Sequence, residues 1–315
     1  MTHTVLVLCG GLSPERDVSI RSGRRTAEAL RDEGLDVHVS DVDASLLDTI
    51  SDVEPDCIIP MLHGAAGEDG SLADVIRTLG YPFVGSRAGA DRVSFDKPVA
   101  KAAMRHWKIP TPEYVALPHT MFRELGASAL LEKVVARLGL PLMVKPAKGG
   151  SSLGASVVTE AGQLPAAMVN AFAYGDVAMI ERFVPGLEVS VAIIETDGHP
   201  QALPAVEIVP DSGFYDYAAR YTAGMTEFFV PARVSEATAE QCAELALTVH
   251  QSFALRDYSR VDLIIAQDGS PVVLEVNVAP GMTETSLLPQ AVEAAGLSLG
   301  GVFARLVDTA VARGT

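Results

Sequence analysis

The sequence has few basic residues for its length. Its 24 Lys and Arg residues face 40 Asp and Glu residues among 315 positions, which gives a formal net charge of −16. Such a surface repels nucleic-acid phosphates and anionic lipid headgroups, so neither nucleic acid nor membrane is expected as a partner. No apolar run approaches the ~18 residues of a membrane helix. The hydrophobic content of 48% supports a folded core and argues against disorder.

Cysteine and lysine are also scarce. The three cysteines (Cys9, Cys57 and Cys242) are odd in number, far apart and set in apolar patterns. This predicts buried thiols in a cytoplasmic protein, without a disulfide or a zinc site. The N-terminal MTHTVLVLCGG lacks a basic region and is typical of a strand rather than a signal peptide. All six lysines lie within 97–148, whereas eighteen arginines are spread along the chain, so a lysine kept here is expected to need its compact ammonium.

The chain is longer than one hydrophobic core usually holds, and its patterns change along its length. We expect an α/β domain with a parallel sheet over 1–98, because short β-branched runs alternate there with helical patterns. An α+β domain over 99–186 and a strand-rich α+β domain over 187–315 are expected to follow. The polar, aromatic segment 211–227 has no periodicity and is interpreted as a surface loop. Strands are predicted at 5–8, 36–43, 57–62, 113–117, 142–145, 177–184, 189–194 and 205–209, and helices at 95–107, 121–138, 160–172, 286–295 and 299–313.

The most informative segment is a hairpin within 259–281. Asp268-Gly269 is a strong two-residue turn signal between alternating patterns. A turn centred there pairs Arg260 with Asn277, Asp262 with Glu275 and Ile264 with Val273 on one face. The other face is then entirely apolar, with Val261, Leu263, Ile265, Val272, Leu274 and Val276.

Two carboxylates directly opposite each other destabilise a sheet unless a cation lies between them. The oxygen ligands of Asp262, Glu275 and Asn277 suit Mg²⁺, which also takes water and phosphate oxygens. The alternative is a solvated face with acids placed by chance and Arg260 as their partner. We favour the metal site, because the apolar back face fixes the register.

A second segment, Lys145 to Gly154 (KPAKGGSSLG), follows a strand and holds three glycines and two adjacent hydroxyls. Backbone N–H groups of such a loop can wrap polyphosphate, and a lysine supplies charge. It is not a Walker A loop, since no G-x-x-x-x-G-K-[ST] occurs in the chain. Many Gly/Ser loops are plain turns, but together with the hairpin this loop favours nucleotide binding.

Two further motifs follow predicted strands, where open α/β sheets bind ligands. His63 opens the glycine-rich HGAAGEDG, which taken alone could be a simple turn. In Ser13-Pro14-Glu15, Ser13 is the predicted N-cap, so that Glu15 falls in the first helical turn. Glu15 either complements the helix dipole or grips a substrate ammonium.

In this order, the motifs resemble those of the D-alanine–D-alanine ligases of the ATP-grasp superfamily, over nearly the whole chain. The resemblance implies three domains, with ATP between the central and C-terminal antiparallel sheets, and a role in peptidoglycan precursor synthesis. We also expect a homodimer. The motifs are GGLSPERDVS (10–19), HGAAGEDG (63–70), VKPAKGGSSLG (144–154), FYDYAARY (214–221), RVDL (260–263) and LEVNVAPGMTETSL (274–287).

The resemblance also implies a reaction. ATP would phosphorylate the carboxylate of a first D-alanine, and the amine of a second D-alanine would attack the acylphosphate and release phosphate. Glu15 would hold the first ammonium, and His63 would lie near the first carboxylate. Ser151 and Tyr221 would join Glu15 in a hydrogen-bonded set across the domains, and 211–227 would be a lid that keeps water from the acylphosphate.

Further roles follow from the same resemblance. Arg260 and the N–H of Gly281 would form the oxyanion site. Ser286 and Leu287, at the start of a helix, would receive the carboxylate of the second substrate. Two Mg²⁺ ions, with Mn²⁺ as an alternative, would lie on the hairpin. ATP would be bound by Lys97, Lys145, Ser152, Glu181, Arg182, Phe183, Val184, Glu188, Phe214, Arg220 and Leu274.

Arg182 and Arg220 depart from the family, whose members usually carry Lys at these positions. Arg can still grip phosphate but is bulkier, so lid geometry and rate are the properties affected. Tyr221 favours D-alanine over D-lactate as the acceptor. The alternatives are an ATP-grasp ligase with another acceptor and a nucleotide sensor without catalysis. A sensor would not need the acyl-transfer residues.

Overall fold

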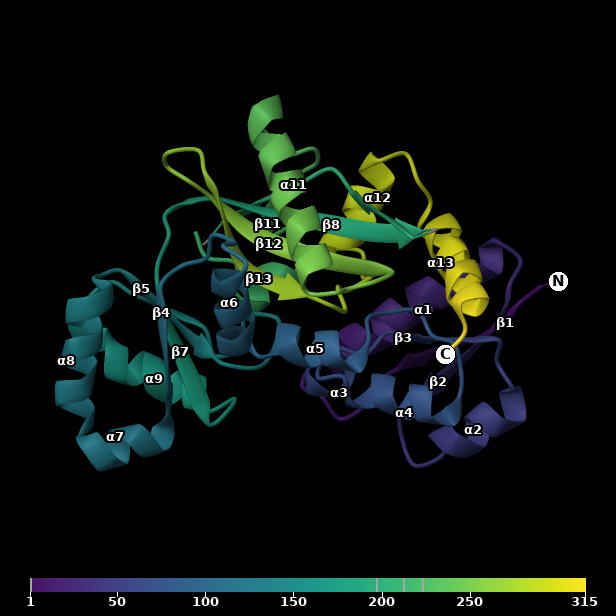
Figure 1. Ribbon diagram of the computed structural model, residues 1–315, viewed down its shortest axis with the longest axis horizontal. Helices are drawn as coiled ribbons and strands as arrows, with labels where there is room; N and C mark the ends of the chain where they lie inside the picture. The colour runs from purple at the N-terminus through teal and green to yellow at the C-terminus, as the bar shows by residue number, and fades with distance from the viewer. Residues whose placement is uncertain (1, 197, 212, 223) are drawn as a thin grey trace.

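The computed structural model describes residues 2–196, 198–211, 213–222 and 224–315. Its strands form three sheets, which follow one another along the chain and are flanked by helices (Figure 1). The mixed α/β and α+β character predicted from the sequence is confirmed.

The first sheet is parallel, with strand order β2-β1-β3. Its two faces are both covered, because Val5 and Val7 pack towards α1 and α13 while Leu6 and Leu8 pack towards α2 and α4. The alternation of these four apolar residues therefore places two hydrophobic layers around one strand. The elements are β1 (Thr4–Cys9), α1 (Arg16–Asp32), β2 (Asp36–Asp41), α2 (Leu46–Val53), β3 (Cys57–Pro60), α3 (Ala65–Glu68) and α4 (Ser71–Leu79).

The second sheet is antiparallel, with order β4-β7-β5-β6. The single helix predicted at 121–138 is in fact two helices, which meet at Gly126, where a φ of 81° interrupts the helical backbone. The helix predicted at 95–107 forms over Lys97–His106, and its N-cap Asp96 accepts the N–H of Val99. The elements are α5 (Ala88–Phe95), α6 (Lys97–His106), β4 (Tyr114–Pro118), α7 (His119–Leu125), α8 (Ala127–Leu138), β5 (Leu142–Pro146), β6 (Ser156–Val158), α9 (Leu164–Phe172) and β7 (Val177–Arg182); a short 3-10 turn, Ala161–Gln163, precedes α9.

The third sheet is also antiparallel, with order β11-β10-β8-β12-β13 and β9 beside β8. One long helix, α11, is not among the predicted helices; its N-cap Ser235 accepts the N–H of Thr238. The elements are β8 (Gly186–Thr196), β9 (His199–Ala202), β10 (Val206–Pro210), α10 (Tyr217–Tyr221), β11 (Thr226–Phe229), α11 (Glu236–Ser252), β12 (Tyr258–Ala266), β13 (Pro271–Asn277), α12 (Leu287–Ala294) and α13 (Leu299–Arg313).

The segment 211–227 is not a loop throughout. It contains helix α10, capped by Asp216, whose carboxylate accepts the N–H of Ala219 at 2.9 Å, and it runs into β11. Helix α10 has only five residues, which are too few to show a helical hydrophobic periodicity in the sequence.

The C-terminal helix α13 packs against α1, near the N-terminus of the chain. In Figure 1, α13 (yellow) lies beside α1 (purple), and Phe303 and Leu306 of α13 share a core with Ala27 and Leu30 of α1. The C-terminal third therefore packs directly on the first sheet, which fixes the site between them.

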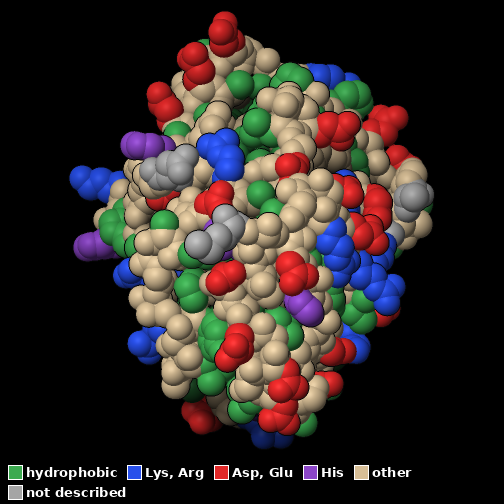
Figure 2. Space-filling view, turned by 90° about the vertical axis from the view of Figure 1, so that its right-hand side faces the viewer, with side chains coloured by type: hydrophobic (Ala, Val, Ile, Leu, Met, Phe, Trp, Pro, Cys, Tyr) green, Lys and Arg blue, Asp and Glu red, His purple; other side chains and the backbone are tan. Residues whose placement is uncertain are grey.

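No single helix among the described residues is long and apolar enough to cross a membrane; α12 and α13 meet the length and composition test only together, as a pair bent by 100°. On the face shown in Figure 2, acidic side chains are spread over the surface, and several basic ones gather in one group at the right of the view. This distribution agrees with the acidic composition.

Candidate active site

A cavity of about 460 Å³ is lined by residues of both antiparallel sheets. Its lining includes all eleven residues that the sequence reading assigned to ATP. They come from α6, from β5 with the glycine-rich loop after it, from β7 and the start of β8, from the segment around α10, and from β13. They are Lys97, Lys145, Ser152, Glu181, Arg182, Phe183, Val184, Glu188, Phe214, Arg220 and Leu274.

The predicted hairpin forms, with a bulge. Arg260 pairs with Asn277 and Asp262 with Glu275 as expected, but the register shifts beyond Asp262. The predicted pair of Ile264 with Val273 is therefore wrong, since Ile264 faces Val272.

Because of the bulge, Val273 and Leu274 lie on opposite faces from those predicted. Val273 is fully buried in the core, a place that the unbroken alternation gave to Val272 and Leu274. Leu274 instead lines the cavity beside Glu275. An extra residue in one strand turns the side chains beyond it to the opposite face, which sequence alternation alone does not reveal.

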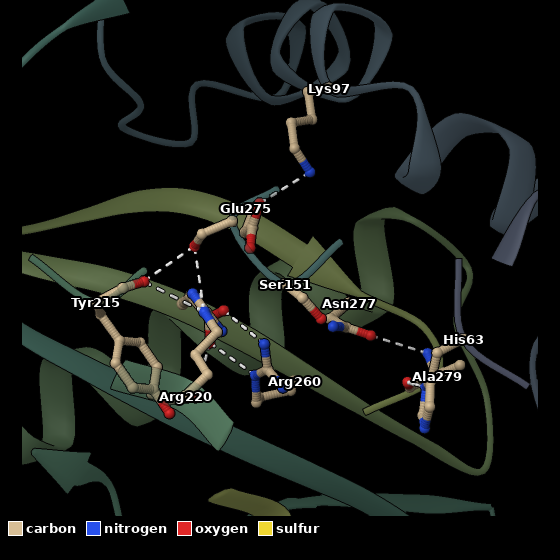
Figure 3. Close-up of polar contacts among 12 residues, drawn as sticks. His63, Lys97, Ser151, Tyr215, Arg220, Arg260, Glu275, Asn277 and Ala279 are labelled. Atoms are coloured by element: carbon tan, nitrogen blue, oxygen red, sulfur yellow. Dashed lines mark hydrogen bonds and ion pairs between the residues drawn. The ribbon is translucent and has the colours of Figure 1, made fainter. Parts of the chain in front are cut away.

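The two carboxylates of the hairpin each have a cationic partner. Arg260 holds Asp262 through two bonds, of 2.8 and 2.7 Å, and Ser190 donates to the same carboxylate at 2.7 Å. Glu275 pairs with Lys97 at 2.9 Å, as Figure 3 shows. Burial would raise the pKa of Glu275, but Lys97 and Lys145 outweigh it and lower that pKa.

Oxygen donors are the only metal-ligand candidates on this hairpin. Asp262 and Glu275 line the cavity, whereas Asn277 does not, and its amide oxygen accepts the N–H of Ala279 at 3.0 Å. Among the described residues no group of three or more His, Cys, Asp or Glu side chains could hold a metal. Two carboxylates and one amide match the few protein oxygens that Mg²⁺ takes beside phosphate and water. They would have to give up part of their bonding to Arg260 and Lys97.

The glycine-rich loop contacts the segment around α10. The Ser152 hydroxyl donates to the carbonyl of Tyr215 at 3.0 Å, and Arg220 donates to both groups, at 3.2 and 3.3 Å. The Arg220 guanidinium also lies 4.2 Å from the centre of the Tyr215 ring (Figure 3). These contacts hold the predicted lid against the loop. The side chain of Tyr221 lies outside the described residues, so the expectation placed on it stays a prediction.

Glu15 precedes α1 rather than lying in its first turn. Ser13 does not cap the helix; its hydroxyl accepts the N–H of Glu15 at 3.1 Å within a turn that ends at Arg16. The expected first-turn position is wrong because this turn delays the helix. Glu15 is buried, Ser151 donates to its carboxylate, and burial raises its pKa. This contact joins the segment before α1 to the glycine-rich loop.

His63 is buried at the same end of the first sheet. Its Nε2 lies 3.0 Å from the Ser22 hydroxyl and its Nδ1 lies 3.1 Å from the carbonyl of Ala279. Burial lowers the pKa of His63 to about 4, so the ring is neutral at pH 7. It therefore links α1 to the segment after β13, close to Gly281.

The remaining predicted residues lie in that same segment. A Cβ on Gly281 would come 2.8 Å from the Ser286 hydroxyl, so only glycine fits without a shift. Ser286 accepts the N–H of Thr283 at 2.9 Å and precedes α12. The Leu287 side chain is buried in the core, which leaves only its backbone N–H for the expected carboxylate contact.

A family comparison covers most of the residues that line the cavity. Residues 103–308 match the family model described as "D-ala D-ala ligase C-terminus". The chain belongs to the D-alanine–D-alanine ligase family. A D-alanine–D-alanine ligase from Anaeromyxobacter dehalogenans (strain 2CP-C) is 40% identical over 306 residues, which cover 97% of this chain and 96% of that protein. One from Desulforudis audaxviator is 37% identical and covers 99% and 100% of the two chains.

Solved structures of this ligase family agree. A D-alanine–D-alanine ligase from Bacillus anthracis complexed with ATP has a TM-score of 0.83 at 26% identity, covering 99% of this chain and 98% of the other. A D-Ala:D-Ser ligase from Enterococcus faecalis has a TM-score of 0.81, also at 26% identity, over 98% and 99%. Solved structures with both of these printed names thus share the fold of this chain.

One further charged residue, Lys101, supports this ligase site and belongs to none of the sequence motifs. Lys101 is 1% exposed; its ammonium lies 2.9 Å from Glu181 and donates to Thr111 at 2.7 Å. Lys145 lies 2.7 Å from the other oxygen of Glu181. The scarcity of lysine was the available signal, but helix α6 places Lys101 one turn beyond Lys97, and no motif includes it.

Proposed function

We propose that this ligase joins two D-alanine molecules into D-alanyl-D-alanine while ATP is converted to ADP and phosphate. A carboxylate oxygen of the first D-alanine attacks the γ-phosphorus and ADP leaves. The amine of the second then attacks the acylphosphate carbon, and phosphate leaves. One observation carries the proposal: the lysine-rich cavity adjoins a buried carboxylate, Glu15, that is bonded to the cavity's own glycine-rich loop through Ser151.

Charge supports the phosphoryl-transfer half. Lys97, Lys145 and Arg220 line one cavity, and phosphoryl transfer needs cations around the transferred oxygens. Asp262, Glu275 and Asn277 would hold Mg²⁺, two ions by the family resemblance, which when bound would neutralise charge on the phosphates. Lys101 and Lys145 hold the carboxylate of Glu181 at the end of β7 that the resemblance assigns to the nucleotide.

The two substrate amino acids would be bound by residues near the edge of the first sheet and by neighbouring residues of the C-terminal part of the chain. Glu15 would take the first ammonium, since it is buried and acidic. Neutral His63 would approach the first carboxylate without adding charge. Arg260, 7% exposed, would stabilise the oxyanion together with the N–H of Gly281. The second carboxylate would lie at Ser286 and the N–H of Leu287.

The domain division at 98 and 186, the homodimer and the cytoplasmic location stay predictions. So does the choice of D-alanine as acceptor, for which Tyr221 was the sequence argument. Because a D-Ala:D-Ser ligase fits this fold as well, the acceptor has to be tested directly.

The test is phosphate release from ATP and Mg²⁺ with D-alanine alone, and with D-alanine plus D-serine, D-lactate or L-alanine, with products identified by mass spectrometry. We expect release with D-alanine alone and D-alanyl-D-alanine as the main product of every mixture. A main product that contains D-serine or D-lactate would move the protein to a related acceptor class. ATP binding without phosphate release would favour the sensor.

A further inference from the structure

A second cavity, of about 280 Å³, shares none of its described lining residues with the first. Its walls come from α4, from the segment between α4 and α5, from α5, from the residue two positions before β12, and from Gly314 and Thr315 after α13. Four arginines line it: Arg77, Arg87, Arg92 and Arg256. In a chain of net charge −16 such a gathering of guanidinium groups runs against the composition.

The charge of this arginine cavity is only partly balanced. Among the described lining residues Asp74 is the one acidic side chain, and it lies 3.5 Å from Arg77 and 2.5 Å from Arg92. Arg87 has no side-chain hydrogen bond or ion pair to any residue that the structure describes. The four arginines outnumber Asp74, and Asp257 beside Arg256 is shared with Arg313, so the cavity keeps a positive excess that favours an entering anion.

Arg256 is held in place by several contacts, and its Nε lies 3.9 Å from Asp257, whose carboxylate also accepts two bonds from Arg313. The Arg256 Nε donates to the carbonyl of Gly85 at 2.6 Å, and its guanidinium lies 4.6 Å from the centre of the Phe83 ring. Phe83 and Tyr81 also line the cavity. A fixed guanidinium beside an aromatic wall can accept a ligand that is anionic at one end and apolar at the other.

We propose that the arginine cavity binds the phosphate group of a small phosphorylated molecule. A phosphate dianion offers three oxygens, enough for forked bonds from more than one guanidinium, whereas a single carboxylate would leave most of these donors unused. Ala88 and Gly89, at the N-terminal end of α5, also line the cavity, and the helix dipole there adds to the attraction. The proposal concerns a site other than the ATP cavity and does not depend on the proposed function.

Inorganic phosphate is the probe. Its binding is measured by isothermal titration calorimetry on the full chain, with a non-hydrolysable ATP analogue and Mg²⁺ present so that the first cavity is filled. We expect Arg87→Gln to weaken binding at least tenfold, which corresponds to about 1.4 kcal/mol. Arg123→Gln, an exposed arginine on α7 outside both cavities, is the matched control and should leave binding unchanged.

A second variant has the opposite expected sign. Asp74→Asn removes the acid that competes for Arg77 and Arg92, so phosphate binding should tighten severalfold. Unfolding of either variant would appear as a lowered melting temperature, which is measured alongside. Absence of saturable phosphate binding, or equal binding by the wild type, Arg87→Gln and Asp74→Asn, would overturn the proposal. Because this experiment measures binding and not turnover, a negative result would not count against the proposed ligase reaction.

Discussion

Buried carboxyl groups on the two sides of the site experience opposite electrostatics. On the nucleotide side, burial would raise the pKa of Glu181, but the ammonium groups of Lys101 and Lys145 outweigh it and lower that pKa. On the side of the first sheet, burial raises the pKa of Glu68 to about 8, and it raises the pKa of Glu15 as well. The same residue type is thus ionised in one region and inclined to hold its proton in the other.

This difference indicates what each region is built to receive. Lysines that already neutralise Glu181 and Glu275 form a framework in which further anionic oxygens find donors nearby. Glu15 has a hydroxyl partner, Ser151, but no ion pair with any described residue. An ammonium group entering there would supply the missing charge, so the first sheet side is suited to an amino acid and the cavity to phosphate.

Glu188 departs from this division. It lines the nucleotide cavity, yet burial raises its pKa to about 7, because no lysine pairs with it among the described residues. A carboxyl of this kind accepts or donates a bond to hydroxyl groups. The family resemblance places adenine and ribose at this end of the cavity, away from the phosphate charge.

The largest expected effect comes from Glu275→Gln. It should lower kcat about a thousandfold, equivalent to about 4 kcal/mol, because it removes charge from both the metal position and Lys97. From the sequence alone, removing one of the opposed carboxylates Asp262 and Glu275 is expected to stabilise the fold. Since each acid has its own cation here, we expect no stabilisation.

Steady-state ligation and thermal unfolding of Glu275→Gln check both statements. Asp268→Asn, at the exposed turn of the same hairpin, serves as the control and should keep wild-type activity. Normal turnover in Glu275→Gln would remove this carboxylate from the nucleotide side of the comparison.

Next in size is Glu15→Gln, which tests the ammonium-binding side. It should raise KM for the first D-alanine about 10- to 100-fold, as expected for loss of a charged bond of about 1.5–3 kcal/mol, and leave ATP affinity near wild type. Asp17→Asn lies in the first turn of α1 and is the control for a helix-dipole role. Similar small stability losses in both variants, with KM unchanged, would mean that Glu15 only complements the dipole.

Much of this contrast was accessible from the sequence, because motifs encode local chemistry. The alternation around Asp268-Gly269 placed Asp262 opposite Glu275 correctly. The small number of lysines indicated special roles for them. The eleven residues that the family resemblance assigned to ATP all line one cavity.

What the sequence could not supply depends on contacts between distant segments. The bulge that turns Leu274 into the cavity is invisible to alternation, since one extra residue fits the pattern on either side. Lys101 and Glu181 are 80 positions apart, and only the packing of α6 on the second sheet joins them. The turn before α1 overrode the N-cap preference of Ser13, because its hydroxyl bonds the N–H of Glu15 first.

The third prediction concerns stability and the proton on Glu68. Its folded pKa of about 8 lies above its ordinary value of 4.5, so the folded state keeps a proton that the unfolded chain releases. Stability is then full below pH 4.5 and falls as the pH rises towards 8. Glu68→Gln should remove this loss and still accept the N–H of Gly64, which Glu68 bonds at 2.8 Å.

We therefore expect Glu68→Gln to raise the free energy of unfolding by on the order of 2 kcal/mol at pH 8 and by little at pH 4. Urea unfolding at both pH values measures this difference. A gain that is the same at both pH values would show that Glu68 does not hold a proton in the folded protein, and would weaken the contrast between the two sides.

The smallest expected effect tests whether charge alone matters on the nucleotide side. Arg220→Lys keeps the positive charge in the cavity but loses the bond to Ser152 and the stacking on Tyr215. The stacking is worth about 0.5–1 kcal/mol at an exposed site, so KM for ATP should rise only about two- to fivefold. Arg220→Gln removes the charge too, and should raise KM and lower kcat further. If Arg220→Lys proves as damaging as Arg220→Gln in the phosphate-release assay, then the shape of the guanidinium, rather than its charge, holds the lid on the glycine-rich loop.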